Sequence, residues 1–222
     1  MSSIESVEHA VVLAGGRSSR MGRSKAFLDV GGETMARRLV LGLDRLFDTV
    51  SLSIAAPSSS EEDPELTRLV GAAGVWQDEF PERGPLEGVR SSMRALTVEF
   101  AFFIAVDTPL VWVPLVRALV RSAEDSGRGA VPRFAGRLEP GFAVYSRTLL
   151  DDIESAFEAG ETRLQSMADW DGVAVLDLDD SEGLEGRDVP AELFWSVNTP
   201  EEYDRLLQAM DSGPVSRDPI IF

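Results

Sequence analysis

The stretch AVVLAGGRSSRMGRSK, Ala10–Lys25, joins a run of apolar residues to a basic loop that contains three glycines. A continuous apolar run that ends in glycine is typical of a parallel strand buried on both faces. In folds built on such strands, ligands bind beyond the carboxyl ends, where glycine lets backbone N–H groups approach phosphate oxygens. The stretch therefore predicts a first strand followed by a phosphate-binding loop. Lys25 is the only lysine among the 21 basic residues of the chain.

The spacing of this loop differs from two standard phosphate-binding loops. The Walker A pattern G-x-x-x-x-G-K-[ST] is excluded, because five residues separate Gly16 from Gly22 and Lys25 follows three residues later. The dinucleotide fingerprint G-x-G-x-x-G is excluded because Gly15 and Gly16 are adjacent. For the paired glycines alone, an ordinary turn beside a solvated basic loop is the simpler interpretation. Two arginines and Lys25, at fixed spacings from these glycines, favour phosphate binding.

Strand and helix patterns alternate along the first half of the chain. Apolar runs predict strands over residues 10–14, 49–56, 74–78 and 99–107. Apolar residues at helical spacing predict helices over 34–47, in a segment ending at Val70, and over 85–96, the first of them capped by Thr34. This alternation predicts an α/β fold with three layers, a mainly parallel sheet and right-handed crossovers.

In the second half of the chain, strands and helices no longer alternate regularly. Residues 129–146 read as two strands around Ala135–Gly136, which predicts a small antiparallel part of the sheet. The other expected elements are helices over 113–127, 148–159, 161–170 and 199–210, the last capped by Thr199, and a strand over 173–178. We expect residues 1–210 to form a single domain, with a nucleotide-binding part at about 8–110 and an acceptor-substrate part at about 111–210. Residues 211–222 show no pattern and are expected to be a mobile tail.

Composition excludes several classes of function. A formal net charge of −17 argues against non-specific binding to nucleic acid or anionic membranes. The chain has no cysteine, hence no disulfide and no thiolate nucleophile or metal ligand. No signal peptide is recognisable, and no apolar run approaches the roughly 20 residues of a membrane span. We therefore expect a cytoplasmic protein, and the single histidine, His9, is interpreted as structural.

Four sequence blocks together resemble one family. The pattern L-A-G-G-x-x-S-x-R-M-G-x-x-K is similar to the signature of the MobA-like nucleotidyltransferases, and of the molybdenum cofactor guanylyltransferases in particular. The blocks GPLEGVRSSMRAL, FIAVDTPLV and FWSVNTPEEYDRL resemble further motifs of that family and follow in the same order, from Val11 to Leu206. The resemblance implies a Rossmann-like nucleotidyltransferase fold.

The resemblance also implies a reaction. Such enzymes transfer GMP from GTP to the terminal phosphate of molybdopterin in molybdenum cofactor biosynthesis, and they release pyrophosphate with Mg²⁺ bridging the phosphates. Positioning and charge neutralisation do most of the work in this chemistry, which suits a chain without cysteine. Transient partners among molybdoenzymes or other proteins of cofactor biosynthesis are implied as well.

Residues of the first loop take their implied roles from the family pattern. Leu13, Ala14 and Gly15 match the backbone that contacts the nucleotide, and Gly16 and Gly22 shape the loop. Arg20 and Lys25 match the phosphate-binding cations, and both are also implied to be catalytic.

The later blocks carry the remaining candidates. Asp107 ends an apolar strand and is implied to be catalytic and to bind Mg²⁺, a metal that takes one or two carboxylates plus substrate phosphates; the alternative is a helix N-cap. Asp78 matches a nucleotide-binding aspartate, with Glu79 and Glu82 as neighbouring alternatives. The residues implied to lie near the base, the metal or the second substrate are Gly84, Pro85, Leu86, Gly88 and Asn198.

The chain departs from the family pattern in two places. Ala55 and Ala56 stand where the family often has an asparagine that contacts the nucleotide, and Gly141 stands where a larger apolar residue is usual. Two other functions stay open: a cytidylyltransferase or another transferase of the same fold acting on a different phosphate, and a non-catalytic nucleotide-binding module. The blocks LAGG and GPLEG favour guanine, and the presence of both Lys25 and Asp107 favours catalysis.

Overall fold

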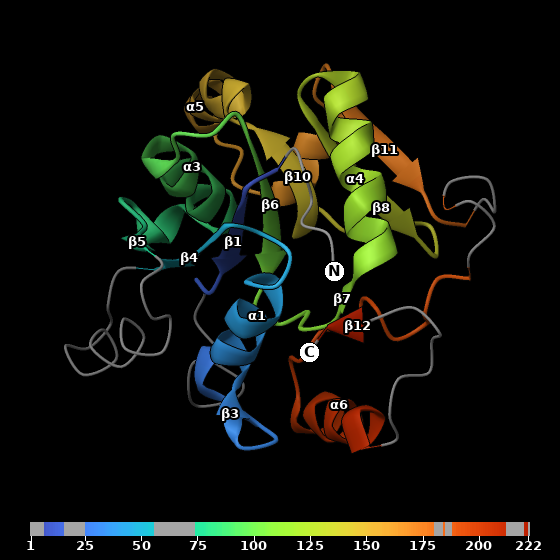
Figure 1. Ribbon diagram of the computed structural model, residues 1–222. Coiled ribbons are helices and arrows are strands. Elements are labelled where there is room, and N and C mark those ends of the chain that lie inside the picture. Colours follow the sequence, from blue (N-terminus) through green and yellow to red (C-terminus); the bar gives the residue numbers. More distant parts are fainter. Residues whose placement is uncertain are drawn as a thin grey trace.

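The computed structural model describes residues 7–15, 25–55, 74–179, 184, 188–211 and 220–221, in which strands and helices alternate around a central sheet (Figure 1). The strands of this sheet are β1 (His9–Leu13), β4 (Thr49–Ile54), β5 (Val75–Gln77), β6 (Phe100–Ala105), β8 (Gly129–Phe134), β9 (Arg137–Leu138), β10 (Phe142–Ser146) and β11 (Val173–Asp177). The α-helices are α1 (Met35–Leu43), α3 (Pro85–Ala95), α4 (Val113–Ser126), α5 (Leu150–Glu158) and α6 (Pro200–Asp211). The 3-10 segments are η1 (Lys25–Phe27), η2 (Pro81–Arg83), η3 (Arg147–Leu149) and η4 (Leu164–Asp169).

The central sheet has the strand order β11-β8-β10-β6-β1-β4-β5, with β9 paired to β8. Strands β5, β4, β1 and β6 run parallel, whereas β10 is antiparallel to both of its neighbours, β6 and β8. This arrangement confirms the predicted α/β fold with a mainly parallel sheet and a small antiparallel part. The apolar run at Val11–Val12 is fully buried because β1 lies between β4 and β6, with both of its faces covered.

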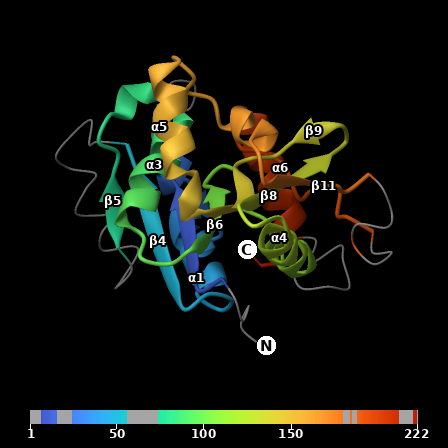
Figure 2. The same ribbon diagram turned by 90° about the horizontal axis from the view of Figure 1, so that it is seen from above.

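Helices cover both faces of the sheet and make the three predicted layers. Helices α1 and α4 pack on one face, where Leu39 and Leu119 join one apolar cluster. Helices α3 and α5, with η4, cover the other face, where Met93 joins a second cluster (Figure 2). Because successive side chains of a strand point to opposite faces, Val12 belongs to the first cluster and Val11 to the second.

The prediction of a helix over residues 161–170 is wrong, since the chain forms only the 3-10 segment η4 there. The Glu161 carboxylate accepts hydrogen bonds from the backbone N–H groups of Thr162 (2.8 Å) and Arg163 (2.9 Å). These bonds close a local turn, and Arg163 adopts an extended backbone conformation (φ −91°, ψ 136°). Helical geometry therefore begins only after Arg163, although Met167 still reaches the core.

Two short antiparallel pairs were not predicted, because strands of two residues carry no readable period. Strand β2 (Asp29–Val30) pairs with β3 (Glu33–Thr34), and the glycines between them both have positive φ, 65° and 86°. Strand β7 (Val111–Trp112) pairs with β12 (Ile220–Ile221), which lies in the tail where the sequence shows no pattern. The end of the chain thus lies beside the segment that follows β6.

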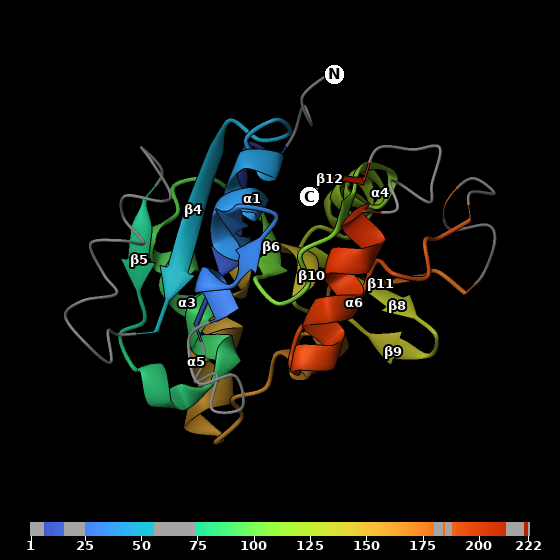
Figure 3. The ribbon, with the colours of Figure 1, turned by 90° about the horizontal axis from the view of Figure 1, so that it is seen from below.

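The carboxyl ends of β1, β4 and β6 meet at one edge of the sheet, which faces the viewer in Figure 3. Helix α6 and the β2–β3 hairpin lie at this edge, and the Tyr203 hydroxyl donates a hydrogen bond to the carbonyl oxygen of Asp29. Segments from both ends of the chain therefore border the edge where a ligand is expected. No helix among the described residues has both the length and the apolarity to cross a membrane.

Candidate functional site

The first loop starts between β4 and β6. The Ala14 N–H donates to the carbonyl oxygen of Ser53 (2.8 Å), and the Val106 N–H donates to the carbonyl oxygen of Leu13 (3.0 Å). The structure therefore places Leu13, Ala14 and Gly15 at the carboxyl end of the central strand, where the sequence predicts the nucleotide. Three predicted loop residues lie outside the described part of the chain and keep their roles as predictions: Gly16, Arg20 and Gly22.

Two glycines allow close packing beneath this loop. A Cβ atom on Gly15 would lie 3.3 Å from a carboxylate oxygen of Asp78 and 3.4 Å from the backbone nitrogen of Ala55. A Cβ atom on Gly88 would lie 3.3 Å from the side chain of Leu13. A side chain at either position would require these neighbours to move by a few tenths of an ångström, so the glycines allow close packing at this end of the sheet.

A lysine, an aspartate and an asparagine from distant segments meet at this edge. The Lys25 Nζ donates to Asp107 Oδ2 (2.9 Å) and to Asn198 Oδ1 (2.5 Å). The Lys25 and Asp107 side chains are 17% and 28% exposed, so solvent and ligands reach both. The Asn198 amide nitrogen donates to the Ser196 hydroxyl (2.7 Å), which turns the amide oxygen towards the lysine. We call this group the lysine centre.

The start of α6 holds Asn198 in place. The Glu202 carboxylate accepts from the N–H groups of Asn198 (2.7 Å) and Thr199 (2.9 Å), while the Glu202 N–H donates to the Thr199 hydroxyl (3.3 Å). This reciprocal arrangement is a capping box, and it confirms the predicted Thr199 cap. The Val197 N–H also donates to the carbonyl oxygen of Asp107 (2.8 Å), which links the start of α6 to the end of β6.

Asp78 lies at the neighbouring strand end, in a nearly buried position. Its Oδ1 accepts a hydrogen bond from the Ser53 hydroxyl (3.1 Å) within β4. Burial raises the pKa of the Asp78 carboxyl to about 6, the Ser53 hydrogen bond opposes that rise, and the charge of Glu87 adds to it. Of the two alternative residues, Glu79 has a half-exposed side chain and Glu82 is exposed, whereas the nearly buried Asp78 carboxylate lies beside Gly15.

The GPLEG block forms the turn into α3. Gly84 has φ +80°, and a Cβ atom there would lie 3.3 Å from the carbonyl oxygen of Thr162, so glycine suits both the turn and its packing. Pro85 occupies the first helical position, as predicted. The Leu86 side chain is fully buried in the core and its N–H donates to the Thr162 carbonyl oxygen, so a ligand would meet this turn through the Gly84–Pro85 backbone.

The sequence analysis did not single out Glu139, which lies close enough to Asp107 for their charges to interact. The Ala105 N–H donates to the carbonyl oxygen of Gly141 (2.7 Å), which brings the segment before β10 beside the end of β6. Burial raises the pKa of the Glu139 carboxyl, the charge of Arg137 lowers it, and the charge of Asp107 raises it further. Gly141 fits here because a Cβ atom would lie 3.3 Å from the Ala105 methyl group.

His9 lies at the opposite end of β1 from the lysine centre. Its Nε2 is 2.9 Å from the Ser51 hydroxyl, and its ring stacks on Trp76 with 5.4 Å between ring centroids. Burial lowers the pKa of the imidazole. These contacts agree with the structural role predicted for the single histidine.

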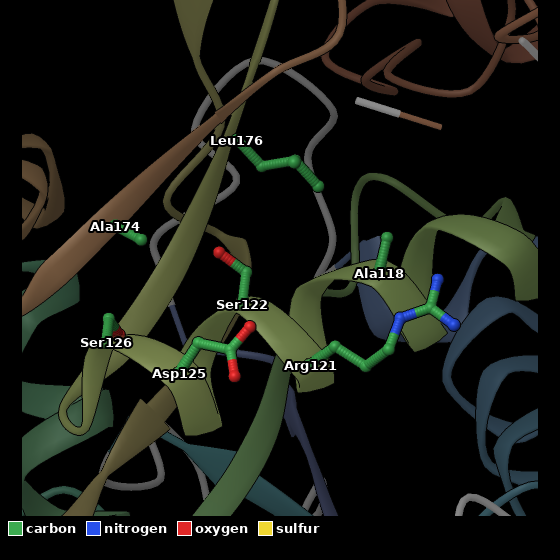
Figure 4. A pocket seen from close by; sticks show the side chains of 7 residues that line it. All are labelled: Ala118, Arg121, Ser122, Asp125, Ser126, Ala174 and Leu176. Carbon is green, nitrogen blue, oxygen red and sulfur yellow. The ribbon is translucent and has the colours of Figure 1, made fainter. Parts of the chain in front are cut away.

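A surface hollow of about 440 Å³ lies between α4 and the edge strand β11, and Figure 4 shows its side chains. Side chains of α4 and β11 line it: Ala118, Arg121, Ser122, Asp125, Ser126, Ala174 and Leu176. None of these residues belongs to the candidate site, so the hollow is separate from the lysine centre and from Asp78.

The chain is similar to known proteins over most of its length. The family model described as the MobA-like NTP transferase domain matches residues 10–175. A probable molybdenum cofactor guanylyltransferase of Methanosarcina mazei is 32% identical over 207 residues, which cover 91% of this chain and 91% of that protein. A molybdenum cofactor guanylyltransferase of Desulfosudis oleivorans is 31% identical over 207 residues, which cover 93% and 97%.

A solved structure has the same fold. The crystal structure of molybdopterin-guanine dinucleotide biosynthesis protein A from Archaeoglobus fulgidus superimposes with a TM-score of 0.72 and 19% sequence identity. The superposition covers 92% of this chain and 99% of that one. At this identity the likeness concerns the fold, which agrees with the arrangement of strands and helices described above.

Proposed function

The chain belongs to the MobA-like NTP transferase family and is a nucleotidyltransferase, and from this premise we propose that it transfers GMP from GTP to the terminal phosphate of molybdopterin. Pyrophosphate is the second product. The names of the two guanylyltransferase relatives support this choice of substrates. The observation that carries the proposal is the lysine centre, in which Lys25 donates hydrogen bonds to Asp107 and Asn198, so that three motif residues from separate blocks meet.

The nucleotide is assigned to the edge formed by the first loop, Asp78 and the start of α3. The backbone of Leu13–Gly15 would face the nucleotide, and Gly84–Pro85 would lie near the base. Asp78 is a suitable acceptor for base or ribose donors because its carboxylate is nearly buried beside Gly15 and Gly88. In a site shielded from water such a hydrogen bond discriminates strongly between ligands.

The donor set of the lysine centre fits Mg²⁺. A carboxylate oxygen of Asp107 and the amide oxygen of Asn198 both converge on one positive charge, the Lys25 ammonium. Hard oxygen donors suit Mg²⁺, which commonly takes one or two carboxylates together with substrate phosphates. Among the described residues there is no group of three or more His, Asp or Glu side chains arranged to hold a metal ion. We assign Asp107 as the ligand of a Mg²⁺ ion that would neutralise phosphate charge when bound.

Lys25 is assigned to the phosphates of the nucleotide. Its ammonium is a compact point charge on a flexible stem, so rotation of the side chain can exchange the Asp107 oxygen for a phosphate oxygen. That exchange would leave the Asp107 carboxylate available to the cation. The partial exposure of both side chains allows it, since neither ion has to be moved through a packed interior.

The acceptor is assigned to the part of the chain that follows β6. The terminal phosphate of molybdopterin attacks the α-phosphorus of GTP, and the bond from that phosphorus to the bridging oxygen breaks as pyrophosphate leaves. The chain needs no nucleophile of its own, because positioning and charge neutralisation supply most of the catalysis. The division into two parts, the transient protein partners and the cytoplasmic setting stay predictions from the sequence.

The test is a transfer assay with the purified chain, molybdopterin, Mg²⁺ and either GTP or CTP. Pyrophosphate release should be at least about tenfold more efficient with GTP, equivalent to roughly 1.4 kcal/mol. A preference for CTP would make the protein a cytidylyltransferase of the same fold. Nucleotide binding without pyrophosphate release would instead indicate a binding module.

A further inference from the structure

A fully buried carboxylate lies directly behind the nucleotide edge and has no part in the reaction proposed above. Glu87 is in the first turn of α3, and its side chain is 0% exposed. Its Oε1 accepts hydrogen bonds from the backbone N–H of Phe80 (3.2 Å), the Ser91 hydroxyl (2.9 Å) and Arg90 Nη1 (2.9 Å). Its Oε2 is buried with no hydrogen-bond partner among the described residues.

Arg90 extends this contact to the surface. Its side chain is 4% exposed, and its Nη1 and Nη2 donate to Glu79 Oε2 (3.1 and 3.0 Å) while its Nε donates to Glu154 Oε1 (2.8 Å). The Glu79 N–H donates in turn to the Ser91 hydroxyl (3.3 Å). We call Glu87, Arg90, Ser91 and Glu79 the buried clamp.

The clamp acts on the two residues that follow Asp78. The N–H groups of Glu79 and Phe80 and the Glu79 carboxylate all bind side chains of α3. The Asp78 N–H donates to the carbonyl oxygen of Ile54 (2.9 Å), so β4 fixes one side of Asp78 and the clamp fixes the other. The orientation of the Asp78 carboxylate therefore depends on Glu87 and Arg90.

Stability alone gives a poor account of this clamp. Burying an ion pair costs desolvation that its attraction repays only with good geometry, and an apolar pair of similar volume is often as stable. Here one Glu87 oxygen lacks a hydrogen bond among the described residues, so the arrangement is not optimised for stability. Its geometric effect, a fixed turn beside Asp78, is the feature that an apolar pair would not reproduce.

We infer that Glu87 and Arg90 are positioning residues that hold the turn from Asp78 to Gly84 in its nucleotide-binding conformation and thereby set nucleotide affinity. The inference rests on the proposed function, in that Asp78 is taken to contact the nucleotide. It differs from a catalytic role, because both side chains are too deeply buried to contact a substrate. Loss of the clamp should therefore raise KM for the nucleotide and leave kcat nearly unchanged.

The experiment compares Glu87→Gln with Arg94→Gln in the full chain. The amide keeps the size of Glu87 and an acceptor for Phe80 and Ser91 but loses the charge that pairs with Arg90. Arg94 is the matched control, since it lies on the same helix and binds the same Glu79 oxygen (2.9 Å) from a half-exposed position. Surface pairs of that kind contribute little.

Glu87→Gln should raise KM for GTP at least about tenfold with kcat within about twofold, and Arg94→Gln should change neither. Hydrogen exchange of the amides of Glu79, Phe80, Glu82 and Arg83, measured without nucleotide, should be faster in Glu87→Gln than in the wild type. If Glu87→Gln fails to fold, Glu79→Gln removes the outer anchor from a half-exposed site and should raise KM about threefold.

Unchanged KM and unchanged exchange in a folded variant would overturn the inference, and so would a loss confined to kcat. Failure of the proposed function looks different, because it appears in the wild type. If the wild type prefers CTP, the same variants are measured with CTP. If the wild type binds neither nucleotide, the difference in amide hydrogen exchange of this turn between Glu87→Gln and the wild type still shows whether the clamp holds the turn.

Discussion

Two ion pairs lie near the same edge of the sheet, and their surroundings differ. Lys25 and Asp107 are partly exposed, and Lys25 is shared with Asn198. Glu87 and Arg90 are buried, with 0% and 4% of their side chains exposed. The first pair joins the ends of distant segments, whereas the second joins neighbouring turns of one helix to the turn beside it.

This difference indicates which pair exchanges partners and which stays closed. Opening a solvent-accessible ion pair costs about 1 kcal/mol or less, because water and other ions replace the lost contact. Removing one member of a buried pair commonly costs about 3–5 kcal/mol, because the remaining charge stays unpaired in a dry environment. The lysine centre is therefore suited to rearrange around phosphates and a cation, and the buried clamp is suited to hold a turn.

The largest expected effect comes from breaking the lysine centre at Asp107. Asp107→Asn removes the charge that would hold Mg²⁺ and should lower transfer by at least about a thousandfold while the fold is retained. Steady-state pyrophosphate release at saturating Mg²⁺ measures the change, and circular dichroism checks the fold. Near-normal turnover would remove Asp107 from the site.

A smaller effect is expected from Lys25→Arg, which keeps the charge. Arginine presents a wide planar fork in place of a compact ammonium, and the close contacts to Asp107 and Asn198 leave little room for it. We expect transfer to fall at least about tenfold, or about 1.4 kcal/mol, nearly as far as in Lys25→Ala. Arg23→Ala, two residues away in the sequence, is the control and should cost little. Full activity of Lys25→Arg would show that the site needs only charge.

The last expected effect concerns stability and not turnover, and it tests the burial of Asp78. Its pKa is raised from 3.8 to about 6, so the unfolded chain ionises first and the contribution of Asp78 to wild-type stability falls as the pH rises from about 4 to about 6. Asp78→Asn carries no such charge and keeps an acceptor for Ser53. The unfolding free energy of the variant relative to the wild type should therefore increase by about 2 kcal/mol between pH 4 and pH 7.

Denaturant unfolding at several pH values measures this difference. Glu161→Gln is the control, because hydrogen bonds from Arg163 and from the backbone of Thr162 lower the pKa of Glu161 to about 2. Its difference from the wild type should be constant above about pH 5. A pH-independent difference for Asp78→Asn would mean that the carboxylate is better solvated than its packing indicates.

Local sequence patterns predicted the elements of the fold well where the pattern was long. The apolar run of β6 and the helical spacing of α4, which ends at Gly127 in a left-handed conformation, were both recognisable. The helix over residues 161–170 failed because hydrogen bonds to Glu161 outweigh helical propensity there. The pairing of Ile220–Ile221 with β7 could not be predicted, because a pair of two-residue strands is determined by proximity.

In the candidate site, too, some features follow from the local sequence and others only from the fold. The sequence by itself determined that glycines, one lysine and an aspartate stand after buried strands, because backbone conformation and strand burial depend on nearby residues. Only the tertiary structure decided that Lys25 meets Asp107, 82 residues away, and Asn198, 173 residues away, and that the charge of Asp107 acts on Glu139. Strand order and register set these distances, and they depend on how whole faces of the sheet pack, which no local pattern contains. The buried clamp is the clearest case, since the sequence predicts only a helix over residues 85–96, and the burial of Glu87 and Arg90 follows from the packing of α3 beside the turn after Asp78.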